Sequence, residues 1–423
     1  MFDNEIVAPG EKVNRIRKML HMTQEELAEG ICSKNNISLI ENNKQKISNN
    51  LASLFVKRLN KSAKEKGINI SVITPEELMK DEDEQANDIF IDVVNELKEI
   101  DSIDLFEQKL LRAENIIKKH HIADSNKIEL YKLSADFYYY KHSYAKSEQM
   151  CDIGIRTSIN SNNMFEEANL YVYKSKNNIF SDKYINALQQ LDYAEELNNS
   201  IANDELSITI LYHKALTYKR LGKYDTALKY FKVLKKFEIK NQKMLLKIKM
   251  VYANCFLDRN EFEKAEKEYF EILDVNDKDF IGLAYKNLSE LYFKSKKYKE
   301  SAKYIKESLI YNEKNLYISD TLYLAAKVLP YVNEDAETYL LQALETCERM
   351  DREKLELIKN IINELVLIYM KREDERNITL MIEKAEELKI NCNKIYAQLI
   401  KYYRYRNIEK SEYFIDMLID KLN

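Results

Sequence analysis

An internal repeat constrains the fold of this chain more than any other feature of its sequence. The clearest copy runs from Ala215 to Phe231 and places small, Tyr, Gly, Tyr, small and aromatic residues at set offsets. The second small position of this frame recurs along the chain at spacings of 33–42 residues, at Ser147, Ala187, Ala227, Ala265, Ser301, Ala336, Ile378 and Ser411. Repetition with this period predicts an array of stacked supersecondary units.

The scarcity of turn-forming residues favours an all-α fold for these units. Only 6 Gly and 3 Pro occur in 423 residues, which argues against a β-sandwich, a propeller or a glycine-rich nucleotide-binding fold. The spacing resembles the tetratricopeptide pattern, in which each unit is a helical hairpin. We expect about eight degenerate hairpins, preceded by an extra helical pair at about 75–119. Such units should stack into a right-handed superhelix with a concave face lined by the first helix of each.

The first 70 residues carry the signals of four short helices. A first helix has apolar residues at helical spacing, at Val13, Ile16 and Leu20. A capping box at Thr23 begins a second helix over 24–29, and Gly30 ends it. Ser33 caps a third helix over 34–41, and a fourth helix closes the bundle. Short helices with a glycine-containing turn between the second and third predict a helix-turn-helix.

The same segment resembles the Xre/Cro-type domain of lambdoid phage repressors over about 55 residues. The resemblance rests on the run from Thr23 to Ala28, then Ser33, then the run from Ile37 to Lys44. It implies that the third helix enters the major groove of DNA and that basic loop residues contact the backbone. The implied DNA-binding residues are Gln24 on a phosphate, Ser33 at the helix start, Lys34, Asn35, Asn36, Ser38 and Leu39 facing base edges, and Lys44 and Lys46 on the backbone. Asn and Lys side chains suit these roles, since Asn pairs with adenine and Lys with guanine.

The charge distribution agrees with a DNA-binding head. Residues 1–70 hold 12 Lys and Arg against 8 Asp and Glu, a net charge of +4. The other 353 residues hold 54 against 62, a net charge of −8. We expect the domains to be a head at 1–70, a linker helix within 71–103 and a repeat domain at 104–423. Thr74, Pro75 and Glu77 begin the linker with a capping box, and the charged run 80–85 should be exposed.

Polar residues of the first helices form a candidate peptide-binding groove. An extended peptide exposes one N–H and one C=O per residue, and an Asn side chain can bond to both. In the repeat frame, the side chains that face the groove are Asn169, Lys176, Tyr212, Lys219, Asn254, Lys286, Asn287, Glu290, Asn360 and Asn363. The alternative for each position is an ordinary solvated surface residue, because Asn is abundant in this chain.

Catalytic and metal-binding motifs are absent from the sequence. The five Cys lie far apart without a CxxC pair, which indicates reduced thiols in the cytoplasm and no disulfide framework. The five His form no metal-binding spacing, and no phosphate-binding loop or nucleophile motif occurs. We therefore expect no enzyme activity, no cofactor and no metal. No apolar run is long enough to span a membrane, and no signal peptide is recognisable at the N-terminus.

The combination of head and repeats resembles the RRNPP family of Gram-positive bacteria and their phages (Rap, Rgg, NprR, PlcR, PrgX). The resemblance implies a cytoplasmic, homodimeric quorum-sensing regulator whose operator binding responds to a short re-imported peptide. Two alternatives stay open. The repeats could instead bind a protein partner, such as an anti-repressor or a phosphorelay component, or the protein could be a phage receptor that controls lysis against lysogeny. The repressor or activator role, the operator, the peptide and the dimer surface are not readable from the sequence.

Overall fold

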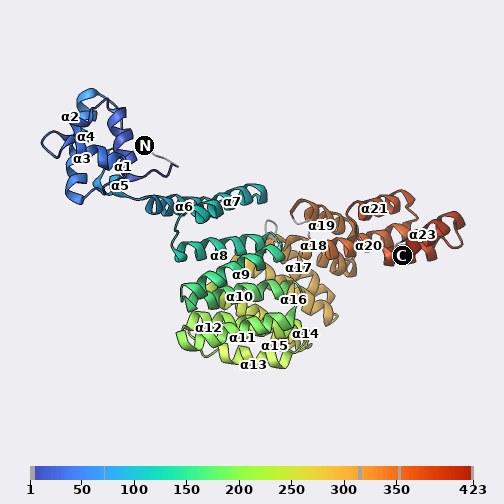
Figure 1. Ribbon diagram of the computed structural model, residues 1–423. Coiled ribbons are helices and arrows are strands. Elements are labelled where there is room, and N and C mark those ends of the chain that lie inside the picture. The colour runs from blue at the N-terminus through green and yellow to red at the C-terminus, as the bar shows by residue number, and fades with distance from the viewer. Residues whose placement is uncertain (1–4, 71, 313–316, 351–353, 421–423) are drawn as a thin grey trace. The chain divides into compact units, whose positions relative to one another are not determined.

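The computed structural model describes residues 5–70, 72–312, 317–350 and 354–420. Over these ranges the regular secondary structure is helical, so the expected all-α fold is confirmed. The chain divides into two compact units, Met1–Ser207 and Ile208–Asn423. Figure 1 shows each unit as a succession of short helices. None of the helices in these ranges has the length and apolar character that a membrane span requires.

The N-terminal bundle contains the helix-turn-helix. Its helices are α1 (Pro9–Met19), α2 (Gln24–Ala28), α3 (Lys34–Glu41) and α4 (Asn49–Lys66). The expected caps of α2 and α3 are confirmed: Thr23 and Glu26 form a complete capping box, and Ser33 Oγ accepts a hydrogen bond from the Asn36 N–H. Gly30 follows α2 with a φ of 70°. The bundle core is apolar, with Val13, Ile16, Leu20, Leu27, Ile37, Ile40, Phe55 and Leu59 buried.

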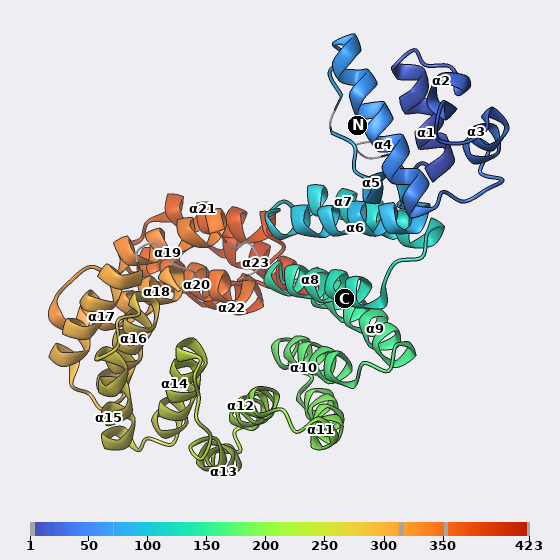
Figure 2. The ribbon, with the colours of Figure 1, turned by 90° about the vertical axis from the view of Figure 1, so that its left-hand side faces the viewer.

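Three helices connect the bundle to the repeats, namely α5 (Pro75–Met79), α6 (Glu82–Lys98) and α7 (Ile103–Lys119). Helices α6 and α7 form an antiparallel pair (Figure 2). Asp81 caps α6 through a capping box with Glu84. Thr74 caps α5 as expected, but the Glu77 carboxylate contacts Lys80 Nζ at 2.8 Å instead of completing the expected capping box. Residues 80–85 were expected to be exposed. This prediction is wrong for Gln85, which is buried with 8% of its surface exposed.

Eight helical hairpins follow in the described ranges, as the repeat pattern predicts. They are α8 (Asp124–Tyr140) with α9 (Tyr144–Asn160), α10 (Met164–Phe180) with α11 (Tyr184–Ile201), α12 (Asp204–Arg220) with α13 (Tyr224–Leu234), α14 (Gln242–Asp258) with α15 (Phe262–Leu273), α16 (Lys278–Lys294) with α17 (Tyr298–Asn312), α18 (Ile318–Val328) with α19 (Ala336–Met350), α20 (Leu355–Arg372) with α21 (Glu375–Glu387), and α22 (Asn393–Tyr403) with α23 (Ile408–Asp420). A short 3₁₀ helix, η1 (Leu329–Val332), follows α18 and contains Pro330.

The recurring small position of the repeat lies where the two helices of a hairpin meet. Ala187, Ala227 and Ala265 are fully buried in the second helices of their hairpins. Ser147 donates a hydrogen bond through Oγ to the Ala135 carbonyl of α8, at 2.6 Å. A side chain this small lets the two backbones approach closely, which explains why the repeat keeps it. First helices of some neighbouring hairpins also contact one another, as α8 and α10 do and as α14 and α16 do.

Candidate functional site

Helix α3 presents a polar first turn on the surface of the bundle. Ile37 and Ile40 are fully buried on one side of the helix, so the opposite side faces solvent. Lys34 and Asn35 are exposed there, together with Ser33 at the cap. An exposed polar turn at the start of this helix is the arrangement that direct base contacts in a major groove require.

The other side chains predicted to face bases lie on the same helix. Asn36 and Ser38 are half-buried, and Leu39 is 37% exposed. Asn36 Oδ1 is buried and has no hydrogen-bond partner among the described residues. Such an acceptor is costly unless something bonds to it. Asn36 therefore has unused hydrogen-bonding capacity at the edge of the predicted DNA surface.

The start of α2 is tied to α3 by a buried polar cluster. Arg17 and Glu41, both 8% exposed, form an ion pair with Nε–Oε1 at 2.5 Å and Nη2–Oε2 at 3.0 Å. Arg17 also donates to the Met22 carbonyl. Gln24, the predicted phosphate contact, donates through Nε2 to Glu41 Oε2 at 2.8 Å. Arg17 lies next to Ile16 in the first helix, and only the fold reveals its burial. The cluster holds Gln24 at the N-terminus of α2.

Lys34, the cation predicted to face bases, forms an ion pair with an exposed acid. Lys34 forms an ion pair with Glu25 of α2, and both side chains are 59% exposed. The hydrogen bond from Lys34 lowers the pKa of the Glu25 carboxyl from its ordinary value. Lys44 and Lys46, the predicted backbone contacts, are exposed in the loop after α3. In this structure, Lys34 is therefore paired with Glu25.

Asn43 has a role that the sequence pattern did not indicate. Its φ of 56° lies in the left-handed region, which Asn tolerates better than most residues. In addition, Asn43 Oδ1 accepts a hydrogen bond from the Gly10 N–H at 3.0 Å. A Cβ on Gly10 would lie 1.8 Å from the Ile40 carbonyl oxygen, so α1 begins in direct contact with the end of α3. The signal that could have found this contact is Gly10 itself, a glycine inside a helix.

Helix α10 carries the two predicted groove residues that lie in the N-terminal compact unit, Met1–Ser207. Asn169 is half-buried. Lys176 Nζ lies 3.4 Å from Asp136 Oδ1, and 4.5 Å and 4.7 Å from the ring centroids of Tyr139 and Tyr173. The charge of Lys176 is therefore already balanced within its own unit.

Two predicted Asn residues of the C-terminal compact unit, Ile208–Asn423, are in direct contact. Asn254 on α14 accepts through Oδ1 from Asn287 Nδ2 of α16, at 3.0 Å, and from the Tyr269 hydroxyl, at 2.6 Å. Both Asn side chains are half-buried. Among the described residues, no hydrogen bond engages Asn254 Nδ2 or Asn287 Oδ1. The pair therefore presents one donor and one acceptor, the complement of a peptide unit.

The remaining groove predictions fall on α12, α16 and α20. Burial raises the pKa of Tyr212 to about 12. Lys219 pairs with Asp258 at 2.9 Å, and Glu290 pairs with Lys294 at 2.9 Å. Lys286 is half-buried beside Asn287. Asn360 is exposed, whereas Asn363 is 7% exposed and its Oδ1 has no partner among the described residues.

The structure thus brings together only some of the predicted groove residues. Asn254 and Asn287 are in contact. Lys286 and Glu290 lie on α16, the helix of Asn287. Asn360 and Asn363 lie on α20, separate from that pair. Asp258 and Tyr269, which bond to Lys219 and Asn254, were missed because their repeat positions do not mark them as groove residues.

Comparison with known proteins identifies the N-terminal domain. Residues 13–66 match the family model described as helix-turn-helix. This match spans α2 and α3 and the exposed polar turn described above. No curated protein matches the sequence.

Solved structures similar to the chain include members of the family that the sequence resembles. The apo form of the quorum sensor NprR from B. thuringiensis is 14% identical with a TM-score of 0.49, and the alignment covers 97% of this chain and 99% of that one. PlcR of Bacillus thuringiensis, in complex with the peptide PapR7 and DNA, is 14% identical with a TM-score of 0.35 over 83% and 99% of the two chains. The apo form of RapI is 14% identical with a TM-score of 0.48 over 78% and 97%.

Proposed function

We propose that this protein is a transcriptional regulator that binds operator DNA through α2 and α3, and a short signalling peptide through its repeats. The peptide changes the affinity for the operator. The observation that carries the proposal is the helix-turn-helix at 13–66 with an exposed polar turn on α3. We further propose that the protein acts in the cytoplasm as a homodimer, because two-fold operators match two-fold proteins.

The DNA-binding part of the proposal is supported by the chemistry of one surface. Lys34 and Asn35 are exposed at the start of α3, and Asn36 has an unpartnered buried acceptor. Lys44 and Lys46 lie in the following loop, where they would contact phosphates. Gln24 is held by Glu41 at the N-terminus of α2, a position that suits a phosphate. Base and backbone contacts would therefore come from adjacent elements.

The peptide-binding part is supported by the amide pair on neighbouring first helices. Asn254 Nδ2 and Asn287 Oδ1 match the C=O and N–H of an extended backbone. Lys286, half-buried beside them, would take an acidic side chain or the terminal carboxylate of the peptide. The pair is preorganised by its mutual hydrogen bond and by Tyr269, which reduces the ordering that binding requires.

The test is operator binding measured with and without peptide. We would titrate the full chain onto DNA from upstream of its own gene, with synthetic peptides cut from any small open reading frame beside it. One peptide, but not its scrambled version, should shift operator affinity. The double variant Asn254→Ala/Asn287→Ala should weaken peptide binding while leaving affinity for DNA alone unchanged.

Two results would contradict the proposal in different ways. If no peptide changes operator binding, the alternative that the repeats bind a protein partner would be favoured. The absence of DNA binding would exclude the regulator function itself. Asn199→Ala, at an exposed Asn on the second helix α11 that is not among the predicted groove residues, serves as the matched control for the double variant.

A further inference from the structure

The first two turns of α6 form hydrogen bonds to the segment that precedes α1 of the head. Gln85 lies there, and its amide bonds to both backbone groups of Val7: the Val7 N–H donates to Oε1 at 3.2 Å, and Nε2 donates to the Val7 carbonyl at 2.7 Å. Val7 is 3% exposed and lies just before Ala8, the N-cap of α1. The amide of Gln85 therefore attaches the start of the head to α6.

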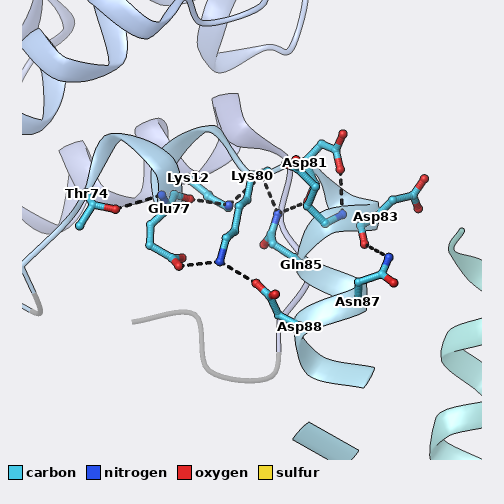
Figure 3. Close-up of polar contacts among 10 residues, drawn as sticks. Lys12, Thr74, Glu77, Lys80, Asp81, Asp83, Gln85, Asn87 and Asp88 are labelled. Atoms are coloured by element: carbon cyan, nitrogen blue, oxygen red, sulfur yellow. Dashed lines mark hydrogen bonds and ion pairs between the residues drawn. The ribbon is translucent and has the colours of Figure 1, made fainter. Parts of the chain in front are cut away.

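A buried lysine of the head reinforces this attachment. Lys12 on α1 is 3% exposed and donates through Nζ to the carbonyls of Glu77 and Lys80, both at 2.9 Å. These carbonyls belong to the end of α5, where helical C=O groups lack partners within the helix. Burial lowers the pKa of Lys12. The Lys80 side chain turns to Glu77 and Asp88, which connects α5 with α6 (Figure 3).

The same turns of α6 also form hydrogen bonds to the segment that precedes the first repeat hairpin. Asn87 donates through Nδ2 to the His121 carbonyl at 2.9 Å and accepts through Oδ1 from the Ala123 N–H at 3.0 Å. Asp83 Oδ1 accepts from the His121 N–H at 3.0 Å. Residues 121–123 lead directly into α8, the first helix of the first hairpin. Gln85 and Asn87, two positions apart on α6, thus bond to different segments: Gln85 bonds to the segment before α1, and Asn87 bonds to the segment before α8 (Figure 3 shows both side chains).

These bonds lie at the border between two apolar cores. The head core includes Ile73, which precedes α5, and Leu78 of α5. Ala86 and Phe90 of α6 belong instead to a core shared with α7, α8 and α9. Apolar burial is non-directional, whereas hydrogen bonds weaken steeply when their geometry changes. Ile6, in the segment before α1, also packs against this second core, so the directional polar bonds of α6 act together with that contact in orienting the head relative to the first hairpin.

We propose that Gln85 and Asn87 are positioning residues that couple the head to the first hairpin. Gln85 holds the head on α6, and Asn87 holds α6 on the first hairpin, so a movement of that hairpin reorients α3. The positioning itself stands independently, while its use in transmitting a peptide signal rests on the proposed function.

Distance measurement between spin labels tests the positioning directly. The labels would be attached at Lys61→Cys on α4 and Arg156→Cys on α9, both exposed sites, in a full chain that also carries Cys32→Ser. The other four thiols are fully buried. We expect a narrow distance distribution that broadens in Gln85→Leu and in Asn87→Ala. The control Asn95→Ala removes an exposed amide of the same helix, whose only side-chain hydrogen bond within the described ranges is with Lys98, and should leave the distribution unchanged.

A second measurement tests the transmission. Operator affinity and peptide affinity are each measured alone, and then the ratio of operator affinities with and without peptide is taken. An allosteric ratio of roughly 5- to 150-fold should fall towards 1 in Gln85→Leu and Asn87→Ala, while the two separate affinities stay within about twofold of the parent chain. A destabilised core would lower the separate affinities instead, and Gln85→Met provides a second variant if Gln85→Leu does not fold.

The outcomes separate this inference from the proposed function. Distributions in both variants as narrow as in the parent chain would overturn the positioning. A broadened distribution with an undiminished ratio would overturn the transmission. A parent chain that binds no peptide would contradict the proposed function, and the distance measurement would still decide the positioning.

Discussion

At the scale of single residues, a buried polar cluster supports the surface that is predicted to bind DNA. Glu41 is the centre, since it binds both Arg17 and Gln24. A buried carboxylate with these partners holds α1, α2 and α3 in one geometry. Removing one partner of such a pair is expected to cost about 3–5 kcal/mol. The residues that would touch DNA are different ones, and their substitution should leave the fold intact.

Two substitutions on this surface should have distinguishable effects. Asn35→Ala should weaken operator binding by about 1–3 kcal/mol relative to unrelated DNA, because it removes a base contact. Lys44→Ala should weaken binding to both DNAs equally and reduce the salt slope by about 1, because it removes a phosphate contact. Both are measured by titration at several salt concentrations.

The control for both variants is Lys61→Ala, which removes an exposed cation from α4. It should change neither specificity nor salt slope. An Asn35→Ala protein with undiminished preference for the operator would show that α3 does not read bases in the predicted way.

At the scale of elements, close helix contacts set the hairpin geometry. Gly282 in α16 is the clearest case. A Cβ at this position would lie 2.2 Å from Asn312 Oδ1 of α17. Asn312 cannot move easily, because it is fully buried and donates to Ser308 Oγ and Thr321 Oγ1. Ser308 in turn donates to the Gly282 carbonyl at 2.9 Å.

Gly282→Ala should therefore destabilise the protein. Helix propensity alone predicts a gain of roughly 0.5–1 kcal/mol for Gly→Ala in a helix. Overpacking against Asn312 should reverse the sign and cost about 1–3 kcal/mol. The quantity to measure is the urea midpoint followed by far-UV circular dichroism.

Gly154→Ala in α9 is the matched comparison. Its new Cβ would lie 2.8 Å from Leu170 Cδ1, the end of a flexible side chain, so the loss should be smaller. Equal losses at the two positions would argue that Asn312 does not restrict α16.

At the scale of the whole molecule, tyrosine replaces tryptophan in the packing of the repeats. The chain has 30 Tyr and no Trp. Burial raises the pKa of Tyr138, Tyr212 and Tyr369 to about 12, from an ordinary value of 10.0. The folded chain therefore holds these phenol protons more tightly than the unfolded chain does. Their contribution to stability is complete below about pH 10 and is lost as the pH rises towards 12.

Alkaline titration should show this loss. The free energy of unfolding should fall between about pH 10 and pH 12, and a variant with Phe at positions 138, 212 and 369 should lose less over that window. Urea unfolding at a series of pH values measures both proteins, and lysine deprotonation affects the two alike. Identical slopes for the variant and the parent would show that these phenols titrate normally in the folded protein.

The helices and their order follow from local sequence signals. Thr23 and Ser33 begin α2 and α3 through short-range capping bonds, and the small residues at Ser147 and Ala227 mark hairpins by their period. These signals act within a few residues of each other or recur along the chain, so a linear pattern contains them. The eight hairpins and the buried stripe at Val13, Ile16 and Leu20 were predictable for that reason.

The polar contacts between elements were decided only by the tertiary structure. Gln85 belongs to a charged run that was expected to be exposed, and Lys12 is a charged residue of the first helix, yet both are buried because backbone carbonyls far along the chain bond to them. Asn254 and Asn287 were each predicted singly, and only the packing of α14 on α16 brought their amides together. A linear pattern specifies which face of a helix is apolar, but the partner of a buried polar group depends on how the helices pack.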